Sequence, residues 1–252
     1  MSDGHAPAEH YPGPVHTPPL HTDPGYAGHS GESHGQGHAA HHPRLQHHFD
    51  DMAQQAEAST LGMWVFLVTE IMFFGGLFMA YLVYRTQMPD AFREASHHLD
   101  ITLGATNTVI LIVSSLTMAL AVRSAQTGQP AKTQVGWLVA TMVFGAAFLG
   151  IKAIEYTEKF RDHIVPGPFF EWHGTYPRGA EMFYSLYFAM TGLHALHMVV
   201  GLGIMTVMAS LAWRGRFDDT YYTPIEVSGL YWHFVDIVWI FLFPLLYLIG
   251  RH

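Results

Sequence analysis

Cysteine is absent from this 252-residue chain, and charged residues are scarce. Without cysteine, disulfides and thiolate-ligated metal sites are both excluded. Charged residues make up 13% of the sequence and hydrophobic residues 50%, whereas a soluble domain carries roughly 25% charged residues. The composition therefore predicts a membrane protein.

Positive charge is the scarcer of the two signs. The chain has 12 Lys and Arg against 20 Asp and Glu, which gives a formal net charge of -8. A nucleic-acid-binding surface needs clustered basic residues. We therefore expect no nucleic acid partner.

Residues 1–58 lack tryptophan and contain one basic residue, Arg44. So little apolar surface does not offset the entropy of ordering, so we predict a disordered tail. It has neither the basic nor the apolar region of a secretory signal. The tail is rich in His, Gly and Pro, and its imidazoles suit either a solvated, pH-responsive segment or loose chelation of divalent metals.

Five apolar stretches follow the tail, each long enough to cross a bilayer as a helix. None alternates with period two, which argues against barrel strands. We predict an all-α polytopic membrane domain over residues 59–252, with Ser59 and Thr60 capping the first helix and Asp100 capping the second. The predicted spans are residues 61–84, 101–122, 133–156, 181–213 and 229–249.

Glu70, His233 and Asp236 lie inside these spans, where ionisation is costly. Near the bilayer centre, Glu70 is expected as a neutral acid bonded to a neighbouring helix, or as a carboxyl group facing a lipid or water cleft. His233 and Asp236 are three positions apart on one helix face. We expect a polar cluster that fixes helix register, with Asp236 paired to His233 or to an adjacent helix.

His194 and His197 suggest a metal site at first sight. Residues at i and i+3 point the same way, whereas two imidazoles on a haem approach it from opposite sides. A first-row metal also needs further carboxylate or imidazole ligands. We therefore assign these histidines to helix packing and predict no metal, cofactor or catalytic site in this chain.

Charged residues near the span ends have structural explanations. Lys152 and Glu155 form an ordinary intrahelical ion pair at i and i+3. Glu226 lies close to the start of the last span. Arg214 and Arg216 follow the fourth span, where they suit phospholipid headgroups or simple interface anchoring.

Several motifs occur in the order found in one known family. They are MWVFLVTEIMFF at 63–74, NTVIL at 107–111, GIKAIEY at 150–156, TGLHALHMVVG at 191–201 and YWHFVDIVW at 231–239, with Glu226 seven residues before His233. This chain resembles subunit III of the haem-copper cytochrome c oxidases from about residue 60 to 250. Longer family members have two further N-terminal helices, in whose place this chain has the His-rich tail.

The resemblance implies a non-catalytic subunit of a proton-translocating terminal oxidase in the inner membrane of a prokaryote. It implies that haem and copper lie in partner subunits, chiefly oxidase subunit I and also subunit II. The chain would stabilise the catalytic subunit, bind phospholipid and support proton uptake during aerobic electron transport. Basic residues divide almost evenly between the two sides of the predicted helices, so only the resemblance places the N-terminus in the cytoplasm.

Two other functions remain open. One is the related accessory subunit of a quinol oxidase or nitric oxide reductase. The other is an autonomous transporter that uses Glu70 and Asp236. Transporters are built from repeats with broken helices, and the two halves of this sequence show no such similarity, so the transporter ranks below the others.

Overall fold

The computed structural model describes residues 49, 51–168 and 170–248, and helices dominate this part of the chain. The elements are α1 (Met52–Gln87), α2 (Pro89–His97), α3 (Ile101–Gln126), α4 (Ala131–Arg161), α5 (Pro177–Trp213), α6 (Thr223–Phe243) and the π-helix η1 (Pro244–Leu248). Five spans are long and apolar enough to cross a membrane. The predicted all-α domain with five transmembrane helices is thus confirmed.

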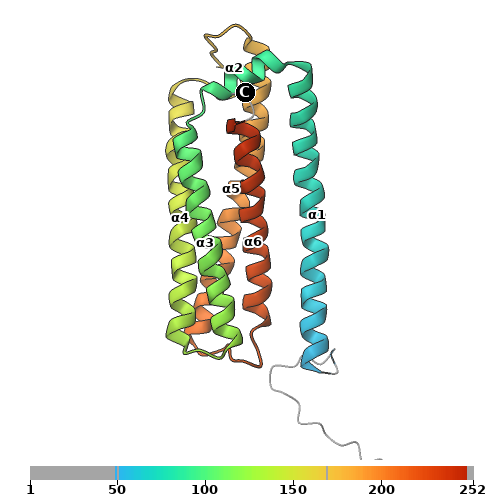
Figure 1. Ribbon diagram of the computed structural model, residues 1–252, viewed down its shortest axis with the longest axis vertical. Helices are drawn as coiled ribbons and strands as arrows, with labels where there is room; N and C mark the ends of the chain where they lie inside the picture. The colour runs from blue at the N-terminus through green and yellow to red at the C-terminus, as the bar shows by residue number, and fades with distance from the viewer. Residues whose placement is uncertain (1–48, 50, 169, 249–252) are drawn as a thin grey trace, which may run out of the picture. The chain divides into compact units, whose positions relative to one another are not determined.

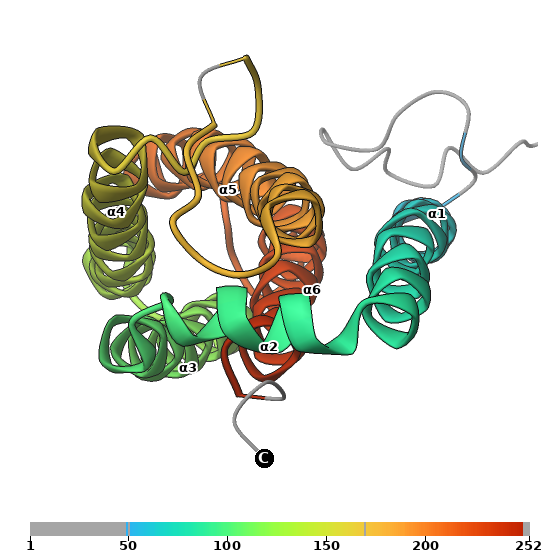
Figure 2. The ribbon, with the colours of Figure 1, turned by 90° about the horizontal axis from the view of Figure 1, so that it is seen from above.

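Helices α3, α4, α5 and α6 form a compact bundle, and α1 stands at its edge (Figures 1 and 2). Each bundle helix contacts the next, since α3 meets α4 and α6, and α5 meets α4 and α6. Helix α1 reaches the bundle mainly through α6 and α5. One helix is therefore far less enclosed by protein than the other four.

The helices extend beyond the predicted spans at several ends. Helix α1 begins at Met52, inside the segment assigned to the tail, and most of the rest of that segment lies outside the described residues. Helices α5 and α6 begin at Pro177 and Thr223, also earlier than expected. Hydropathy marks only the apolar part of a helix, whereas the backbone hydrogen bonds continue through the polar residues of the interface.

The caps agree with the predictions at one helix and not at another. Asp100 caps α3, because its Oδ1 accepts from the N–H groups of Thr102 and Leu103 at 2.8 and 3.4 Å. The predicted cap of α1 was wrong: Asp51 Oδ1 accepts from Gln54 N–H at 2.7 Å, and Ser59 donates to a carbonyl within the helix. Asp51 lies before both predicted caps and is a favourable N-cap residue, so the helix starts there.

Helix α2 was not predicted. It is too short to span a membrane and crosses the end of the bundle between α1 and α3 (Figure 2). Its apolar side is buried, and Phe92 packs edge-on against Tyr81 of α1 and Phe183 of α5 at 5.3 and 5.5 Å between ring centroids. This helix therefore fixes the upper end of α1 in Figure 1 to the bundle.

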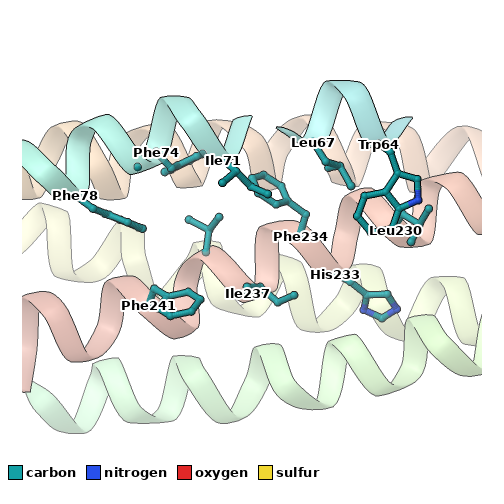
Figure 3. Close-up of a pocket in the computed structure, with 12 residues that line it drawn as sticks. Trp64, Leu67, Ile71, Phe74, Phe78, Leu230, His233, Phe234, Ile237 and Phe241 are labelled. Carbon is teal, nitrogen blue, oxygen red and sulfur yellow. The ribbon is translucent and has the colours of Figure 1, made fainter. Parts of the chain in front are cut away.

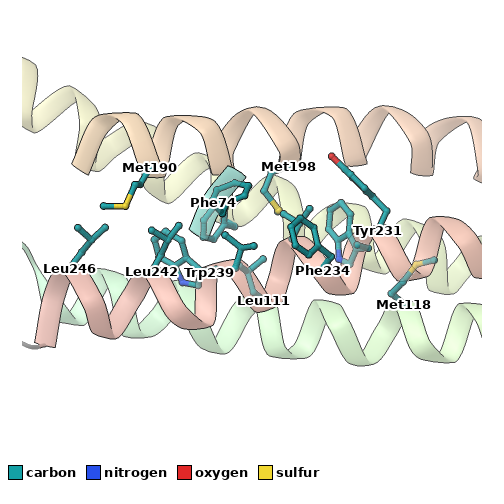
Figure 4. Close-up of a cluster of buried hydrophobic side chains, with 14 of the residues drawn as sticks. Phe74, Leu111, Met118, Met190, Met198, Tyr231, Phe234, Trp239, Leu242 and Leu246 are labelled. Atoms are coloured by element: carbon teal, nitrogen blue, oxygen red, sulfur yellow. The ribbon is translucent and has the colours of Figure 1, made fainter. Parts of the chain in front are cut away.

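The bundle core is centred on α6 and contains large aromatic and sulfur-containing side chains (Figure 4). Trp232 is fully buried and lies between two glycines of neighbouring helices. A Cβ atom on Gly145 or Gly201 would come within 2.7 or 2.9 Å of the indole. Gly201 therefore allows α5 and α6 to approach closely, whereas Gly203 of the same helix has no neighbouring atom within 4 Å of its Cβ position.

Candidate functional site

Polar side chains within the spans lie at contacts between helices. Glu70 of α1 meets His197 of α5, with Oε2 and Nε2 3.2 Å apart. His197 Nδ1 is 2.9 Å from the carbonyl oxygen of Leu193. A carbonyl only accepts, so Nδ1 must donate, which leaves Nε2 to accept from a neutral Glu70 or to donate to a carboxylate. Either way, the Glu70–His197 pair shares one proton and carries no net charge.

His194 is buried elsewhere. Its ring lies between Phe148 of α4 and Trp239 of α6, each 5.3 Å away between ring centroids. Neither ring nitrogen makes a hydrogen bond within the described part of the chain. The expectation that His194 and His197 point the same way was wrong, because a rotation of about 60° between i and i+3 is enough to face different neighbours.

Helix α6 is joined to α3 by three side-chain contacts. Trp232 Nε1 donates to Ser114 Oγ and Trp239 Nε1 donates to Thr108 Oγ1, both at 3.1 Å. His233 Nδ1 lies 2.7 Å from Ser115 Oγ. The hydroxyl partners of the two indoles and the imidazole were not predicted, although NTVIL at 107–111 and the serines after it lie on the same helix.

Asp236 is 2% exposed, and neither carboxyl oxygen has a hydrogen bond of normal geometry within residues 51–168 and 170–248. The predicted pairing with His233 is not seen, since that imidazole bonds to Ser115 instead. The Ser115 hydroxyl nevertheless lies close enough to interact with the carboxyl group. Asp236, Ser115 and His233 therefore form a short polar series from the bundle interior to its surface.

A buried ion pair forms the most elaborate polar group. Lys152 Nζ lies 3.0 Å from Glu155 Oε2 and also donates to the hydroxyls of Tyr187 and Tyr247 at 3.0 and 3.1 Å. Both hydroxyls donate in turn to Glu155 Oε1, at 2.8 and 2.6 Å. The ammonium group also lies 5.2 Å from the centre of the Trp239 ring. We name these residues the Lys152 cluster.

The Lys152 cluster ties α4 to α5 and η1. The ion pair itself was predicted, but as an ordinary intrahelical pair near the end of a span. In the structure both charged side chains are almost completely buried, at 3% and 1% exposed. The burial of this ion pair could not be predicted from the sequence, because the two tyrosines that bond to it are distant from it along the chain.

The remaining candidates lie at the ends of helices. Glu226 is in the first turn of α6, where a negative charge interacts favourably with the helix dipole. Arg214 follows the last residue of α5, and Arg216 lies two residues further, both exposed. These three side chains are therefore separate from the intramembrane groups.

An apolar groove runs between α1 and α6, with a volume of about 470 Å³ (Figure 3). Its lining residues are Trp64, Leu67, Ile71, Phe74, Gly75, Phe78, Leu230, His233, Phe234, Ile237, Val238 and Phe241. Glu70 does not line it. Of the intramembrane polar candidates, His233 is among the lining residues.

The candidate residues do not converge on one reaction centre. Within the described part of the chain, no group of three or more His, Asp or Glu side chains is placed to hold a metal ion. The polar groups are spread along the membrane spans, and most of them connect two helices. The arrangement is suited to holding helices in register.

Comparisons with known proteins support one family. The family model for "Cytochrome c oxidase subunit III" matches residues 46–251. The chain is similar to cytochrome c oxidase subunit 3 of Synechocystis sp., at 34% identity over 75% of this chain and 74% of the relative. It is also similar to the subunit of the same name from Corynebacterium diphtheriae, at 35% over 75% and 87%. Quinol oxidase subunit 3 of Bacillus spizizenii is 31% identical over 79% of this chain and 90% of the relative.

Proposed function

Because this chain belongs to the cytochrome c oxidase subunit III family, we propose that it holds the catalytic subunit of a haem-copper oxidase in the membrane without taking part in oxygen chemistry. Haem and copper would reside in partner subunits, chiefly subunit I and also subunit II. The observation that carries this proposal is the use of intramembrane polar groups as ties between helices. The Glu70–His197 pair and the Lys152 cluster are both engaged in this way.

These interhelical hydrogen bonds make the helical bundle rigid, which favours the binding of a partner subunit. Interhelical hydrogen bonds in membranes are worth roughly 0.6 to 2 kcal/mol each, and α3 and α6 share three side-chain contacts of this type. A rigid bundle loses little conformational entropy when another subunit binds. We therefore assign the buried acids and imidazoles to stability and assembly.

Arg214 and Arg216 support a second part of the proposal. Both are exposed where α5 leaves the membrane. Cationic side chains at this level attract phosphate headgroups by roughly 1 kcal/mol each. We propose that they bind phospholipid on the cytoplasmic side, the side on which the N-terminus would also lie, and that the subunit supports proton uptake by its partner.

The electron donor has two candidates. Cytochrome c is the first, and quinol is kept as the second because relatives named for both kinds of oxidase match over most of their length. An oxygen electrode assay of the purified complex separates them. Oxidation of reduced cytochrome c supports the first candidate, and oxidation of a short-chain quinol alone supports the second.

Gentle detergent extraction of the tagged chain tests the proposal as a whole. We expect haem absorption in the visible spectrum and a larger co-purifying subunit in the mass spectrum. Membranes from cells that carry the untagged chain provide the control. A haem-free chain that purifies alone and moves ions in vesicles would contradict the proposal in favour of a transporter.

A further inference from the structure

The last membrane span does not end as a regular α-helix. Helix α6 stops at Phe243, and Pro244 begins the five-residue π-helix η1, which ends at Leu248. Proline has no N–H and clashes with the carbonyl four residues before it, so a regular α-helix is disturbed at this point. Single π-helical turns are rare and frequently occur at functional sites. This turn is thus a candidate for a role beyond crossing the membrane.

One side of η1 is bonded to the bundle interior. The Tyr247 hydroxyl accepts from Lys152 Nζ at 3.1 Å and donates to Glu155 Oε1 at 2.6 Å. The Tyr247 side chain is fully buried, and both of its bonds involve a charged group. Such charge-assisted bonds are roughly twice as strong as neutral ones. The Lys152 cluster therefore fixes the position of this turn.

The backbone of the same turn bonds to α1. The carbonyl oxygen of Leu245 accepts a hydrogen bond from the Tyr81 hydroxyl at 2.9 Å. Carbonyl groups in the last turn of a helix have no partner within that helix, so this one is available to a neighbouring helix. Tyr81 is 2% exposed and is the last of the three buried residues of α1. The Arg85 guanidinium also interacts with its hydroxyl from within α1. The bond to Leu245 thus attaches the upper end of α1 in Figure 1 to η1.

We infer that η1 is a clasp that couples the docking of α1 to the Lys152 cluster. Tyr247 and Leu245 are two positions apart in one five-residue turn, so a turn that moves when Tyr247 is released carries the Leu245 carbonyl away from Tyr81. Helix α1 meets the bundle mainly through α6 and α5, and it then loses one of its few polar attachments. The inference goes beyond the proposed function and does not depend on it, because every group that it invokes belongs to this chain.

A double-mutant cycle tests the coupling in the full chain, purified with whichever subunits accompany it. Dyes on genetically encoded residues at Met79 of α1 and Ile154 of α4 are placed at positions 61% and 59% exposed. Energy transfer between them reports the ratio of separated to docked α1 at a fixed SDS concentration. Tyr81→Phe should raise this ratio by about threefold, as expected for one interhelical hydrogen bond. In the Tyr247→Phe background the same change should raise it by less than about 1.5-fold, because the carbonyl is no longer held in place.

Tyr156→Phe provides the matched control background. It also removes a tyrosine hydroxyl that joins two helices, but this hydroxyl bonds to Thr191 of α5 and not to η1. Tyr81→Phe should keep its full effect there. An equal effect of Tyr81→Phe in all three backgrounds would overturn the inference. Loss of the effect in the Tyr156→Phe background would overturn it too, because the bundle would then be loosened in general.

A second background covers the case in which Tyr247→Phe does not accumulate. Lys152→Met combined with Glu155→Gln replaces both charge-assisted bonds of Tyr247 by at most one neutral bond. The effect of Tyr81→Phe should again fall below threefold in this background. An undiminished effect would show that α1 docks independently of the Lys152 cluster, and η1 would then not be a clasp.

Discussion

Helices α1 and α6 are both apolar membrane spans, yet they occupy different environments. In α1, only Leu67, Phe74 and Tyr81 are buried among its 36 residues. They are spaced by seven and form one narrow line of contact. In α6, which is much shorter at 21 residues, eleven residues are buried on almost every side. Hydropathy thus predicts that both cross the membrane but does not tell lipid-facing from protein-facing surface.

Helices α1 and α6 differ more clearly in their polar contacts than in their apolar contacts. Helix α6 contributes two indoles and an imidazole to contacts with α3. Helix α1 has Glu70 as its intramembrane acid, and Tyr81 donates to the Leu245 carbonyl at 2.9 Å near its upper end. Several interhelical hydrogen bonds therefore join α6 to the rest of the bundle, whereas few attach α1 to it. Substitutions should be correspondingly costly in the bundle and mild in α1.

The largest effect is expected from Lys152→Met in the Lys152 cluster. The change leaves the Glu155 carboxylate buried without its counter-ion, and breaking a buried pair in this way costs roughly 3 to 5 kcal/mol. Denaturation of the purified complex with SDS, followed by tryptophan fluorescence, measures the loss. We expect the variant to unfold at markedly lower SDS or to fail to accumulate.

A second variant separates charge from packing at the same place. Lys152→Met combined with Glu155→Gln removes both charges and keeps a hydrogen-bond acceptor for the tyrosines. It should be more stable than Lys152→Met alone. If the two variants unfold alike, the buried charge pair is not what stabilises the bundle.

The number and order of the spans could be predicted because each needs only a long apolar run. Asp100 as a cap could be predicted for a similar reason, since a local sequence pattern determines it. The partners of the intramembrane polar groups could not, because Ser115 and His233 are more than a hundred positions apart and meet only after α3 packs on α6. Helix α2 escaped prediction because it is short and only half apolar.

A substitution beside Trp232 should have the next largest effect. Gly201→Leu places side-chain atoms where the indole already lies, since a Cβ alone would be 2.9 Å from it. Overpacking of this kind costs about 1 to 3 kcal/mol. Gly203→Leu on the same helix is the control, because nothing lies within 4 Å of that position. Equal SDS midpoints for the two variants would show that the indole moves aside without cost.

A smaller effect is expected from Ser115→Ala, which removes the contact to His233. One interhelical hydrogen bond in a membrane is worth about 0.6 kcal/mol on average and at most about 2. The control is Ser210→Ala, whose hydroxyl donates to the Val207 carbonyl of its own helix. The SDS midpoint should fall slightly for the first variant and remain unchanged for the second. A larger fall for Ser210→Ala would argue against the α3–α6 contacts as ties.

The smallest effect is expected from Glu70→Gln, on the helix with the fewest ties. Because His197 Nδ1 donates to the Leu193 carbonyl, a neutral imidazole leaves Nε2 as an acceptor. The amide of glutamine donates to it as a carboxylic acid does, so the contact between α1 and α5 should survive with a change well below about 1 kcal/mol. Glu70→Leu removes the donor and should loosen α1. The SDS midpoint of the complex reports on that loosening. A midpoint for Glu70→Gln as low as that for Glu70→Leu would show that the contact requires a carboxylate, and that Glu70 and His197 are held together as an ion pair.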